Sequence, residues 1–297
     1  MPYRLFRYFL KFISYIPFTV LYVISDVLAF VVYHIARYRR KIVRRNLTEC
    51  FPDKNPTEIR RIEKGFYRFF TDNIVETCKM AHMSPEEMSR RMKFTNIDEV
   101  NTLLRNRRSV SLFLGHYGNW EWISSMPLHL CKEAVAAQIY HKLRNKEMDK
   151  LMLEMRGRMG ATNVEMGQTA RFITRRVAAG EVCIVGFIAD QSPHWHELHH
   201  FLPFLHHDTP VMTGPEKITK HYDFEARYVN VRRVRRGYYE AEFIDMADNP
   251  RSMPDFELTG IYYRMLADSI NRQPELYLWS HNRFKHARPL SSPDKNA

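Results

Sequence analysis

Hydrophobic and polar positions follow two different periods along this chain. Residues 56–80 carry apolar side chains at every third or fourth position behind Pro56, which is typical of an amphipathic helix. Residues 109–116 and 181–190 are short, nearly continuous apolar runs, which indicate strands buried on both faces. Because the two patterns alternate, they predict helices packed on a largely parallel sheet.

The same alternation predicts the remaining elements. We expect helices over residues 119–131, 145–159, 168–179 and 256–272, and strands over residues 133–140 and 275–280. Residues 224–231 and 238–244 predict a hairpin that turns around Arg235, Arg236 and Gly237. The expected fold class is therefore α/β: an N-terminal membrane-anchoring helix, then a single α/β domain with a largely parallel central sheet flanked by helices.

The N-terminal part of the chain is the most apolar. Between residues 12 and 36 only Asp26 carries a formal charge. As one helix this run would measure roughly 37 Å, against about 30 Å for the hydrocarbon core of a bilayer. Asp26 near the centre of a spanning helix would cost roughly 2.5–3.5 kcal/mol. A segment that enters one leaflet only, and a buried helix of a soluble domain, are therefore alternatives to a spanning helix.

Basic residues flank this run on both sides. They are Arg4, Arg7 and Lys11 before it, and Arg37, Arg39, Arg40, Lys41, Arg44 and Arg45 after it. The heavier basic flank places residues from 37 onward on the cytoplasmic side. We expect an anchor over residues 1–36, a domain over residues 37–289 and a loose tail over residues 290–297.

Composition narrows the function classes. The 297 residues include 45 Lys and Arg against 33 Asp and Glu, which gives a net charge of +12 and favours an anionic partner. No zinc-finger, RNP or helix-turn-helix pattern supports nucleic acid as that partner. The four cysteines are far apart, which argues against a disulfide scaffold. An anionic membrane or an acidic protein remains.

Residues 115–121 read Gly-His-Tyr-Gly-Asn-Trp-Glu and carry the candidate chemistry. His116 ends an apolar strand, and Glu121 opens the next predicted helix. Catalytic groups collect at strand ends of α/β sheets, and an imidazole can act as general base near neutral pH. A carboxylate on its other nitrogen would hold the tautomer and stabilise the imidazolium. We therefore expect His116 and Glu121 to form a catalytic pair.

A second cluster of histidines lies downstream. Its members are His194, His196, His199, His200, His206 and His207. The spacing approaches the H-x-H-x-D-H pattern of zinc metallohydrolases, but Leu198 stands where the aspartate should be. A polar loop is the favoured interpretation, and a zinc site is the alternative.

Residues 116–121 resemble the lysophospholipid acyltransferase superfamily, whose pattern is His-x4-Asp/Glu. They are most similar to the late lipid A acyltransferases of Gram-negative bacteria, which have Glu and the context H-x-G-N-W-E. Four further stretches agree in the same order: residues 39–52, 190–193, 213–218 and 279–289. The sequence departs from many relatives at Tyr140-His141-Lys142, where they have Tyr-Arg-Pro or Tyr-Lys-Pro.

The resemblance implies an O-acyltransferase of the bacterial inner membrane with its catalytic domain facing the cytoplasm. His116 would take a proton from a hydroxyl of a lipid A precursor, Glu121 would orient His116, and the alkoxide would attack an acyl thioester. Substrate contacts are expected from Asn119, Asn145, Arg158, Asp190, Gln191 and Lys217. The implied partners are acyl carrier protein, an anionic lipid acceptor and the membrane, and no nucleic acid. Acyl-ACP or acyl-CoA would be the co-substrate, with no cofactor and no metal.

Three other functions stay open at this point. The first is the same chemistry on a lysophospholipid, an aminolipid or a glycolipid. The second is a zinc-dependent hydrolase built on the histidines of residues 194–207. The third is a membrane-surface binding protein without catalytic activity.

Overall fold

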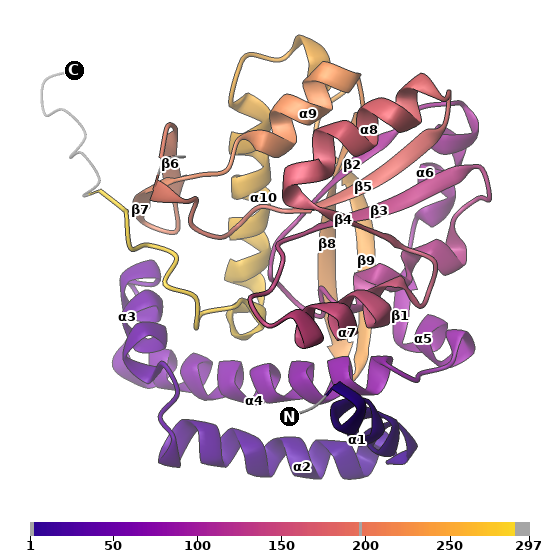
Figure 1. Cartoon of the computed structure of the whole chain (residues 1–297). Helices are drawn as coiled ribbons and strands as arrows, with labels where there is room; N and C mark the ends of the chain where they lie inside the picture. The colour runs from indigo at the N-terminus through magenta and orange to yellow at the C-terminus, as the bar shows by residue number, and fades with distance from the viewer. Residues whose placement is uncertain (1–2, 196–197, 289–297) are drawn as a thin grey trace, which may run out of the picture.

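The computed structural model describes residues 3–195 and 198–288, and its centre is a curled sheet of seven strands (Figure 1). The strand order is β1-β9-β8-β2-β5-β3-β4, and every neighbouring pair is parallel except β8 and β9. The strands are β1 (Met92–Phe94), β2 (Val110–Leu114), β3 (Ala134–Tyr140), β4 (Thr162–Glu165), β5 (Val182–Ile188), β8 (Glu225–Arg235) and β9 (Tyr238–Asp245). A separate antiparallel ribbon is formed by β6 (Phe201–Phe204) and β7 (His207–Pro210). The largely parallel α/β sheet expected from the sequence is confirmed.

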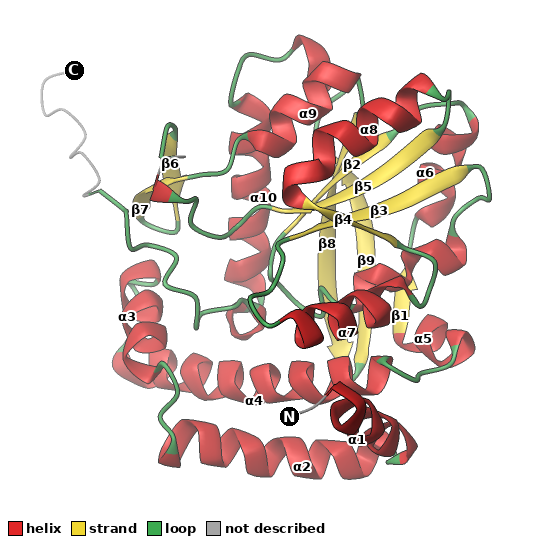
Figure 2. Cartoon of the chain, viewed as in Figure 1, coloured by secondary structure: helices red, strands yellow, loops and turns green. Residues whose placement is uncertain are grey.

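Helices flank this sheet (Figure 2). They are α1 (Tyr3–Tyr15), α2 (Phe18–Phe30), α3 (Arg40–Cys50), α4 (Pro56–Met80), α5 (Pro85–Arg91), α6 (Ile97–Arg105), α7 (Lys146–Gly157), α8 (Thr169–Ala178), α9 (Gly214–Tyr222) and α10 (Glu257–Arg272). Shorter 3₁₀ or π turns are η1 (Val31–Ile35), η2 (Trp122–His129), η3 (Met166–Gln168), η5 (Pro250–Ser252) and η6 (Pro274–Leu276). In Figure 1, α4 crosses below the lower end of the sheet, and α2 lies along the outer side of α4.

Two of the predicted elements differ from the structure. The helix expected over residues 119–131 is the 3₁₀ helix η2, because Pro127 interrupts it and the Ser124 and Ser125 hydroxyls bond to carbonyls three residues earlier. The strand expected over residues 275–280 is wrong: the chain there forms η6 and then a loop that pairs with the rest of the protein through a single β-bridge. The predicted tail over residues 290–297 lies outside the described residues.

The apolar run of residues 12–36 is not one helix. α1 ends at Tyr15 and α2 begins at Phe18, because Pro17 lacks the N–H that a continuous helix would need. Phe18–Ile35 is the only stretch of the described residues that is long and apolar enough to cross a bilayer, and 28% of it is buried against the protein. The 37 Å helix expected from the sequence is therefore replaced by two shorter ones.

Helix α10 anchors the two central strands. The Tyr262 hydroxyl donates to the Leu114 carbonyl at 2.8 Å, and the Tyr263 hydroxyl donates to the Ala189 carbonyl at 2.7 Å. These carbonyls stand where β2 and β5 end, so neighbouring tyrosines of one helix hold both strand ends. The first turn of α10 is held in turn by the buried Glu216 of α9, which accepts from the backbone N–H groups of Phe256 and Thr259.

We predict that Glu216→Ala lowers the free energy of unfolding by about 2 kcal/mol, because two N–H donors of α10 and the Thr259 hydroxyl lose their acceptor. The matched control is Glu257→Ala, which removes an exposed carboxylate from the same helical turn. We expect that change to cost less than about 0.5 kcal/mol in urea unfolding. Equal losses in the two variants would contradict the anchoring role of Glu216.

Candidate active site

The candidate site forms where β2 and β5 end side by side. The two strands are parallel neighbours, and Leu114 pairs with Ile188 in their register. The chain continues two residues past each of these positions, to His116 and to Asp190. Parallel strands that end in register bring the residues behind them to one edge of the sheet. The sheet order therefore places an imidazole next to a carboxylate 74 residues away in sequence.

His116 is held through both ring nitrogens. Its Nδ1 lies 2.7 Å from Asp190 Oδ1, and its Nε2 lies 3.2 Å from the Gln191 side-chain amide nitrogen. Trp120 meets the imidazole edge to face, with ring centroids 5.4 Å apart. The His116 side chain is 20% exposed, whereas that of Asp190 is 2% exposed. Solvent therefore reaches the imidazole but hardly reaches the carboxylate behind it.

The electrostatics of Asp190 define the tautomer of His116. Burial acts to raise the pKa of Asp190, but the charge and hydrogen bonds of His116 outweigh it and leave the pKa below its ordinary value. Asp190 is then ionised at neutral pH and can only accept, so Nδ1 carries the proton of the neutral imidazole. The lone pair stands on Nε2, which accepts from Gln191. This is the arrangement of a general base oriented by a buried carboxylate.

Two glycines allow the chain to approach this site closely. A Cβ on Gly115 would lie 2.8 Å from Leu266 of α10. Gly118 has a φ of +62°, and a Cβ there would lie 2.6 Å from Val231 of β8. A side chain at either position would push the His116 loop away from the helix or the strand that supports it.

Glu121 occupies a different position from the one expected. Its carboxylate forms two hydrogen bonds with Arg156 of α7, at 2.7 and 2.6 Å. Among the described residues, the hydrogen-bond partners of the His116 imidazole are Asp190 and Gln191, and Glu121 is not one of them. The structure thus gives the orienting position at Nδ1 to Asp190, because the two strand ends meet there, whereas Glu121 joins η2 to α7.

Asn119 is part of the core. It is fully buried, its side-chain amide donates to Glu76 at 2.7 Å, and its side-chain oxygen accepts from the Trp122 backbone N–H. Glu76 of α4 also accepts from the hydroxyls of Tyr22 and Tyr239, each at 2.9 Å. Burial raises the pKa of Glu76 to about 7. Asn119 therefore joins the His116 loop to α4, and its fully buried side chain is not accessible to a substrate.

Three other expected contact residues lie apart from His116. Asn145 caps α7 by accepting from the backbone N–H groups of residues 147 and 148. The exposed Arg158 donates to the carbonyls of residues 80 and 83. Lys217 is exposed on α9 and lines a cavity of about 230 Å³ between α9 and the start of α10. Of the six expected substrate contacts, Asp190 and Gln191 are the two that the structure brings to the imidazole.

The C-terminal segment of residues 279–283 closes the site from another side. Its His281 Nε2 accepts from the Ser192 backbone N–H at 3.3 Å, next to Gln191. Burial lowers the pKa of His281 to about 4, so this imidazole is neutral and able to accept. Asn46 of α3 donates to the carbonyls of Trp279 and His281, both at 3.0 Å. The C-terminal segment thus holds the Gln191 loop, and α3 in turn holds the C-terminal segment.

The described histidines of residues 194–207 have separate surroundings. His200 stacks on Phe256, and His207 stacks on Phe284 and bonds to the Leu205 carbonyl. Within residues 3–195 and 198–288, no group of three or more His, Cys, Asp or Glu side chains has the arrangement of a metal site. His196 lies outside the described residues. The polar loop expected here is therefore correct only in part: residues 198–200 have no regular structure, but residues 201–204 form β6, and His207 begins β7 of the antiparallel ribbon.

Sequence reasoning missed the roles of Arg156, Glu76 and His281, and it assigned Asp190 to substrate rather than to His116. One signal for the Asp190 role was present. The apolar run of residues 181–190 ends in an acidic residue, as the run of residues 109–116 ends in histidine. If these two strands are neighbours in the sheet, His116 and Asp190 come together. The sequence alone does not show which strands are neighbours. For Arg156 and Glu76 the sequence carried no such signal.

We predict a pH-dependent stability from His281. Its pKa is about 4 in the folded protein and about 6.5 when unfolded, so the unfolded chain binds the proton first as the pH falls. The stabilisation is complete above about pH 6.5 and is lost as the pH falls towards about 4. Over this interval the wild type should lose up to about 3 kcal/mol more than His281→Gln, which keeps an acceptor but does not titrate. Parallel curves of unfolding free energy against pH would contradict this.

Comparison with known proteins finds relatives over most of the chain. The chain is 27% identical over 258 residues to the lipid A biosynthesis palmitoleoyltransferase of Escherichia coli K12, a match that covers 85% of this chain and 80% of the relative. A lipid A biosynthesis acyltransferase of Shigella flexneri matches to the same extent. A second Shigella flexneri protein, lipid A biosynthesis acyltransferase 2, is 30% identical over 129 residues, which is 42% of this chain and 40% of the relative.

The family model of the bacterial lipid A biosynthesis acyltransferases matches residues 4–286, which is nearly the whole chain. This match includes both strand ends, the supporting helix α10 and the C-terminal segment of residues 279–283. The resemblance seen in five separate stretches of the sequence is thereby confirmed. The chain is an acyltransferase, and it belongs to the bacterial lipid A biosynthesis acyltransferase family.

Proposed function

We propose that this protein transfers a fatty acyl chain from an acyl carrier protein thioester to a hydroxyl of a lipid A precursor, at the cytoplasmic face of the bacterial inner membrane. The observation that carries the proposal is the pair His116–Asp190, in which Nδ1 lies 2.7 Å from the carboxylate and the lone pair of the base stands on Nε2. Family membership supports lipid A as the acceptor.

The reaction requires one base and no covalent enzyme intermediate. The acceptor hydroxyl takes the place of the Gln191 amide at His116 Nε2 and gives its proton to that nitrogen. The alkoxide oxygen attacks the thioester carbonyl carbon, and the tetrahedral intermediate expels the carrier thiolate as the C–S bond breaks. The imidazolium returns the proton to the thiolate, so protons and charges balance. Asp190 stabilises the imidazolium while it exists.

In this proposal Glu121 is a positioning residue. Its two hydrogen bonds fix Arg156, and the pair joins the helix that follows His116 to α7. A pair with side chains 10% and 23% exposed is sensitive to the loss of one partner, because the other charge stays in a poorly hydrated position. Loss of Glu121 would therefore disturb the His116 loop without a direct contact to the imidazole.

Charge supports the proposed partners. The net charge of +12 suits both an acidic carrier protein and the phosphates of a lipid A precursor. The exposed apolar side chains of α1 and α2 suit a membrane location. The sequence departs from many relatives at His141 and Lys142, which are exposed just after β3. If these residues contact the acceptor, the acceptor differs from that of the relatives, and the lipid analysis described next detects this.

The first prediction concerns the base. A strain lacking this gene should lose one acyl chain from lipid A, and wild type but not His116→Ala should restore it when total lipid extracts are analysed by mass spectrometry. Membrane fractions should contain the variant at the wild-type level. Full restoration by His116→Ala would overturn the mechanism. Loss of an acyl group from another lipid class would keep the chemistry and replace the acceptor.

The second prediction separates Asp190 from Glu121. Asp190→Asn should lower kcat by about 100-fold or more, because the imidazole loses its orienting carboxylate. Glu121→Gln should lower the melting temperature, because Arg156 loses its counter-ion. The double variant Glu121→Gln/Arg156→Gln removes both charges and should recover most of that stability, with a kcat at least about tenfold above that of Asp190→Asn. A double variant as inactive as Asp190→Asn would show that Glu121 acts on His116 directly.

A further inference from the structure

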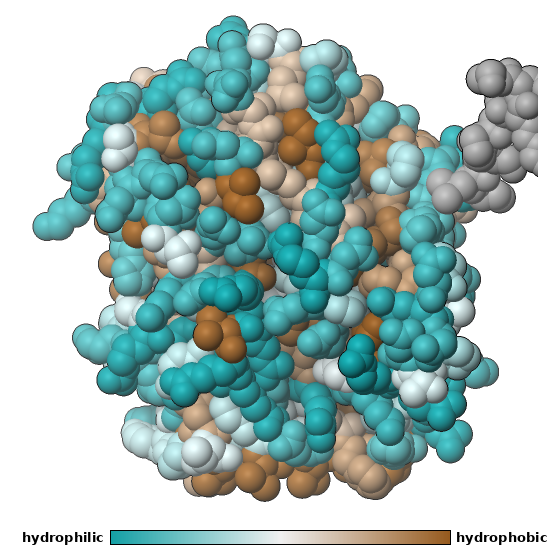
Figure 3. Space-filling view, turned by 180° about the vertical axis from the view of Figure 1, so that it is seen from behind, coloured by the Kyte–Doolittle hydropathy of each residue, from teal (hydrophilic) through white to brown (hydrophobic). Residues whose placement is uncertain are grey.

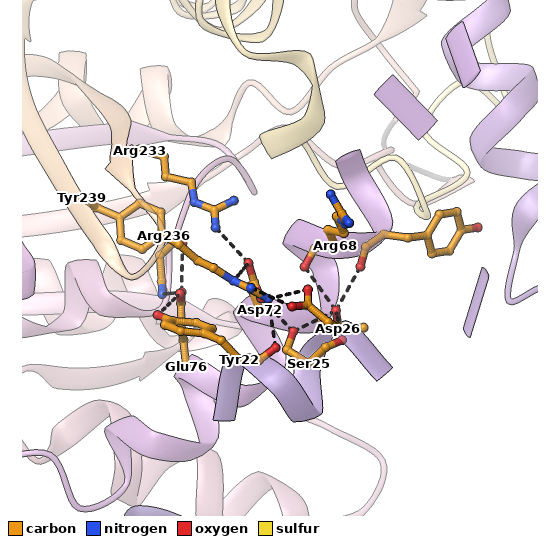
Figure 4. A network of polar contacts seen from close by, with 12 residues as sticks. Tyr22, Ser25, Asp26, Arg68, Asp72, Glu76, Arg233, Arg236 and Tyr239 are labelled. Carbon is orange, nitrogen blue, oxygen red and sulfur yellow. Dashed lines mark hydrogen bonds and ion pairs between the residues drawn. The ribbon is translucent and has the colours of Figure 1, made fainter. Parts of the chain in front are cut away.

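The two faces of helix α2 differ in chemistry. Its inner face carries polar groups that bond to the domain (Figure 4). Tyr22 donates to Glu76 at 2.9 Å, and the fully buried Ser25 donates to Asp72 at 2.7 Å. Asp26 forms two hydrogen bonds with Arg236, at 2.9 and 3.0 Å. The one charged side chain of the helix, which is 48% exposed, is thereby paired with an arginine of the domain.

The partners of α2 are themselves buried and interlinked. Asp72 is 1% exposed and accepts from Ser25, Arg233 and Arg236, while Glu76 is fully buried. If α2 left this surface, the buried carboxylates of Asp72 and Glu76 would each lose a hydrogen-bond donor. Detachment of α2 would also return Asp26 to an apolar environment without its counter-ion. The inner face is therefore a permanent packing surface.

The β8–β9 turn fits against the same face. Gly237 has a φ of +73°, and a Cβ on it would collide with the Tyr22 hydroxyl oxygen. Arg236, next to it in the turn, also donates to the Tyr22 carbonyl at 3.2 Å. The turn and the helix are thus in direct contact, which leaves no space for lipid between them.

The outer face of the N-terminal helices is apolar and exposed. Most of the exposed large hydrophobic side chains among the described residues lie between residues 8 and 38. They are Tyr8, Phe9, Phe12, Tyr15, Val20, Val23, Ile24, Val27, Leu28, Phe30, Ile35 and Tyr38. We call this set the outer apolar face. The space-filling view shows apolar side chains gathered along the lower edge of the molecule, where α2 lies (Figure 3).

Exposed positive charges accompany this face. Lys11 lies on α1, Arg37 and Lys41 follow α2, and Arg235 stands at the end of β8, and all four are exposed. Aromatic and aliphatic side chains bordered by Lys and Arg are typical of helices that lie in the interface of an anionic bilayer. A bilayer with anionic headgroups therefore matches both the apolar centre and the charged border.

We propose that α1 and α2 lie in the plane of a single membrane leaflet and do not cross the bilayer, with both ends of α2 on the side of the catalytic domain. This rests on the proposed membrane location of the enzyme and specifies its geometry. Phe18–Ile35 has the length to span, but its inner face is committed to the domain and 28% of it is buried there. The outer apolar face alone enters the lipid.

One consequence concerns the route of the acceptor. Glu76 bonds to Tyr22 of α2 and to Asn119 of the His116 loop, at 2.9 and 2.7 Å. A single side chain therefore separates the embedded helix from the loop that carries the base. In the proposed orientation a lipid hydroxyl reaches His116 from the same leaflet that holds α2, without the domain leaving the membrane.

The first experiment determines on which side α1 lies. Lys11→Cys in the full chain is treated with a membrane-impermeant maleimide, once in spheroplasts and once in inverted membrane vesicles, and the labelling of the wild type with its four native cysteines is subtracted as background. The matched control is Lys64→Cys on α4, which is exposed in the domain. We expect both cysteines to react only in inverted vesicles. Labelling of Lys11→Cys but not Lys64→Cys in spheroplasts would mean that α2 crosses the bilayer, and would overturn the proposal.

The second experiment tests the outer apolar face. Val23→Asp/Val27→Asp should weaken binding to vesicles that contain anionic phospholipid by at least about tenfold, because two valines no longer enter the lipid. The control Val177→Asp changes a valine of α8 that is 42% exposed, and it should bind as wild type does. Unchanged vesicle binding of the double variant would overturn the proposal. The proposal would also be overturned if the double variant dissociated from a dimer to a monomer without losing vesicle binding, because a second copy of the chain would then cover the outer apolar face.

These results are independent of the acyl transfer reaction. An enzyme that loses activity in His116→Ala but shows a spanning α2 would keep the proposed function and refute the in-plane geometry. A protein with the expected labelling and vesicle binding but without acyl transfer would keep the geometry and refute the function.

Discussion

The candidate site depends on one constraint, the parallel adjacency of β2 and β5. Their shared register brings the residues behind both strands to the same edge, and Tyr262 and Tyr263 hold the two final carbonyls in place. The 2.7 Å contact between His116 and Asp190 follows from this arrangement. Glycine before the histidine lets α10 approach, and the buried carboxylate gives the imidazole the tautomer that a base requires.

Two buried carboxylates of α4 connect this site with the outer helices. Asp72 gathers Ser25, Arg233 and Arg236, whereas Glu76 gathers Tyr22, Tyr239 and Asn119. Buried carboxylates are costly unless they are fully paired, so each one requires its donors to stay in place. Since those donors come from α2, from the β8–β9 hairpin and from the His116 loop, α4 holds three parts of the molecule in one geometry.

The motif around His116 contains the candidate base but not the carboxylate that orients it. The spacing from His116 to Glu121 pointed to the loop that carries the candidate base. It did not identify the partner of the imidazole, because the Glu121 carboxylate is bonded to the oppositely charged Arg156. Whether Asp190 or Glu121 orients His116 depends on how α7, β5 and the His116 loop contact one another. These elements lie far apart along the chain, so a local sequence pattern does not reveal their contacts.

The sequence by itself determined the α/β class, the boundaries of α4 and most strands, the apolar N-terminus and the candidate base, because each follows from local periodicity or composition. Only the tertiary structure decided what required distant partners: the pairing of His116 with Asp190, the burial of Asn119 and the division of the apolar run at Pro17. It also decided that Asp26 meets Arg236. A charge in an apolar helix has a local cost, but its neutralisation depends on a hairpin 210 residues away.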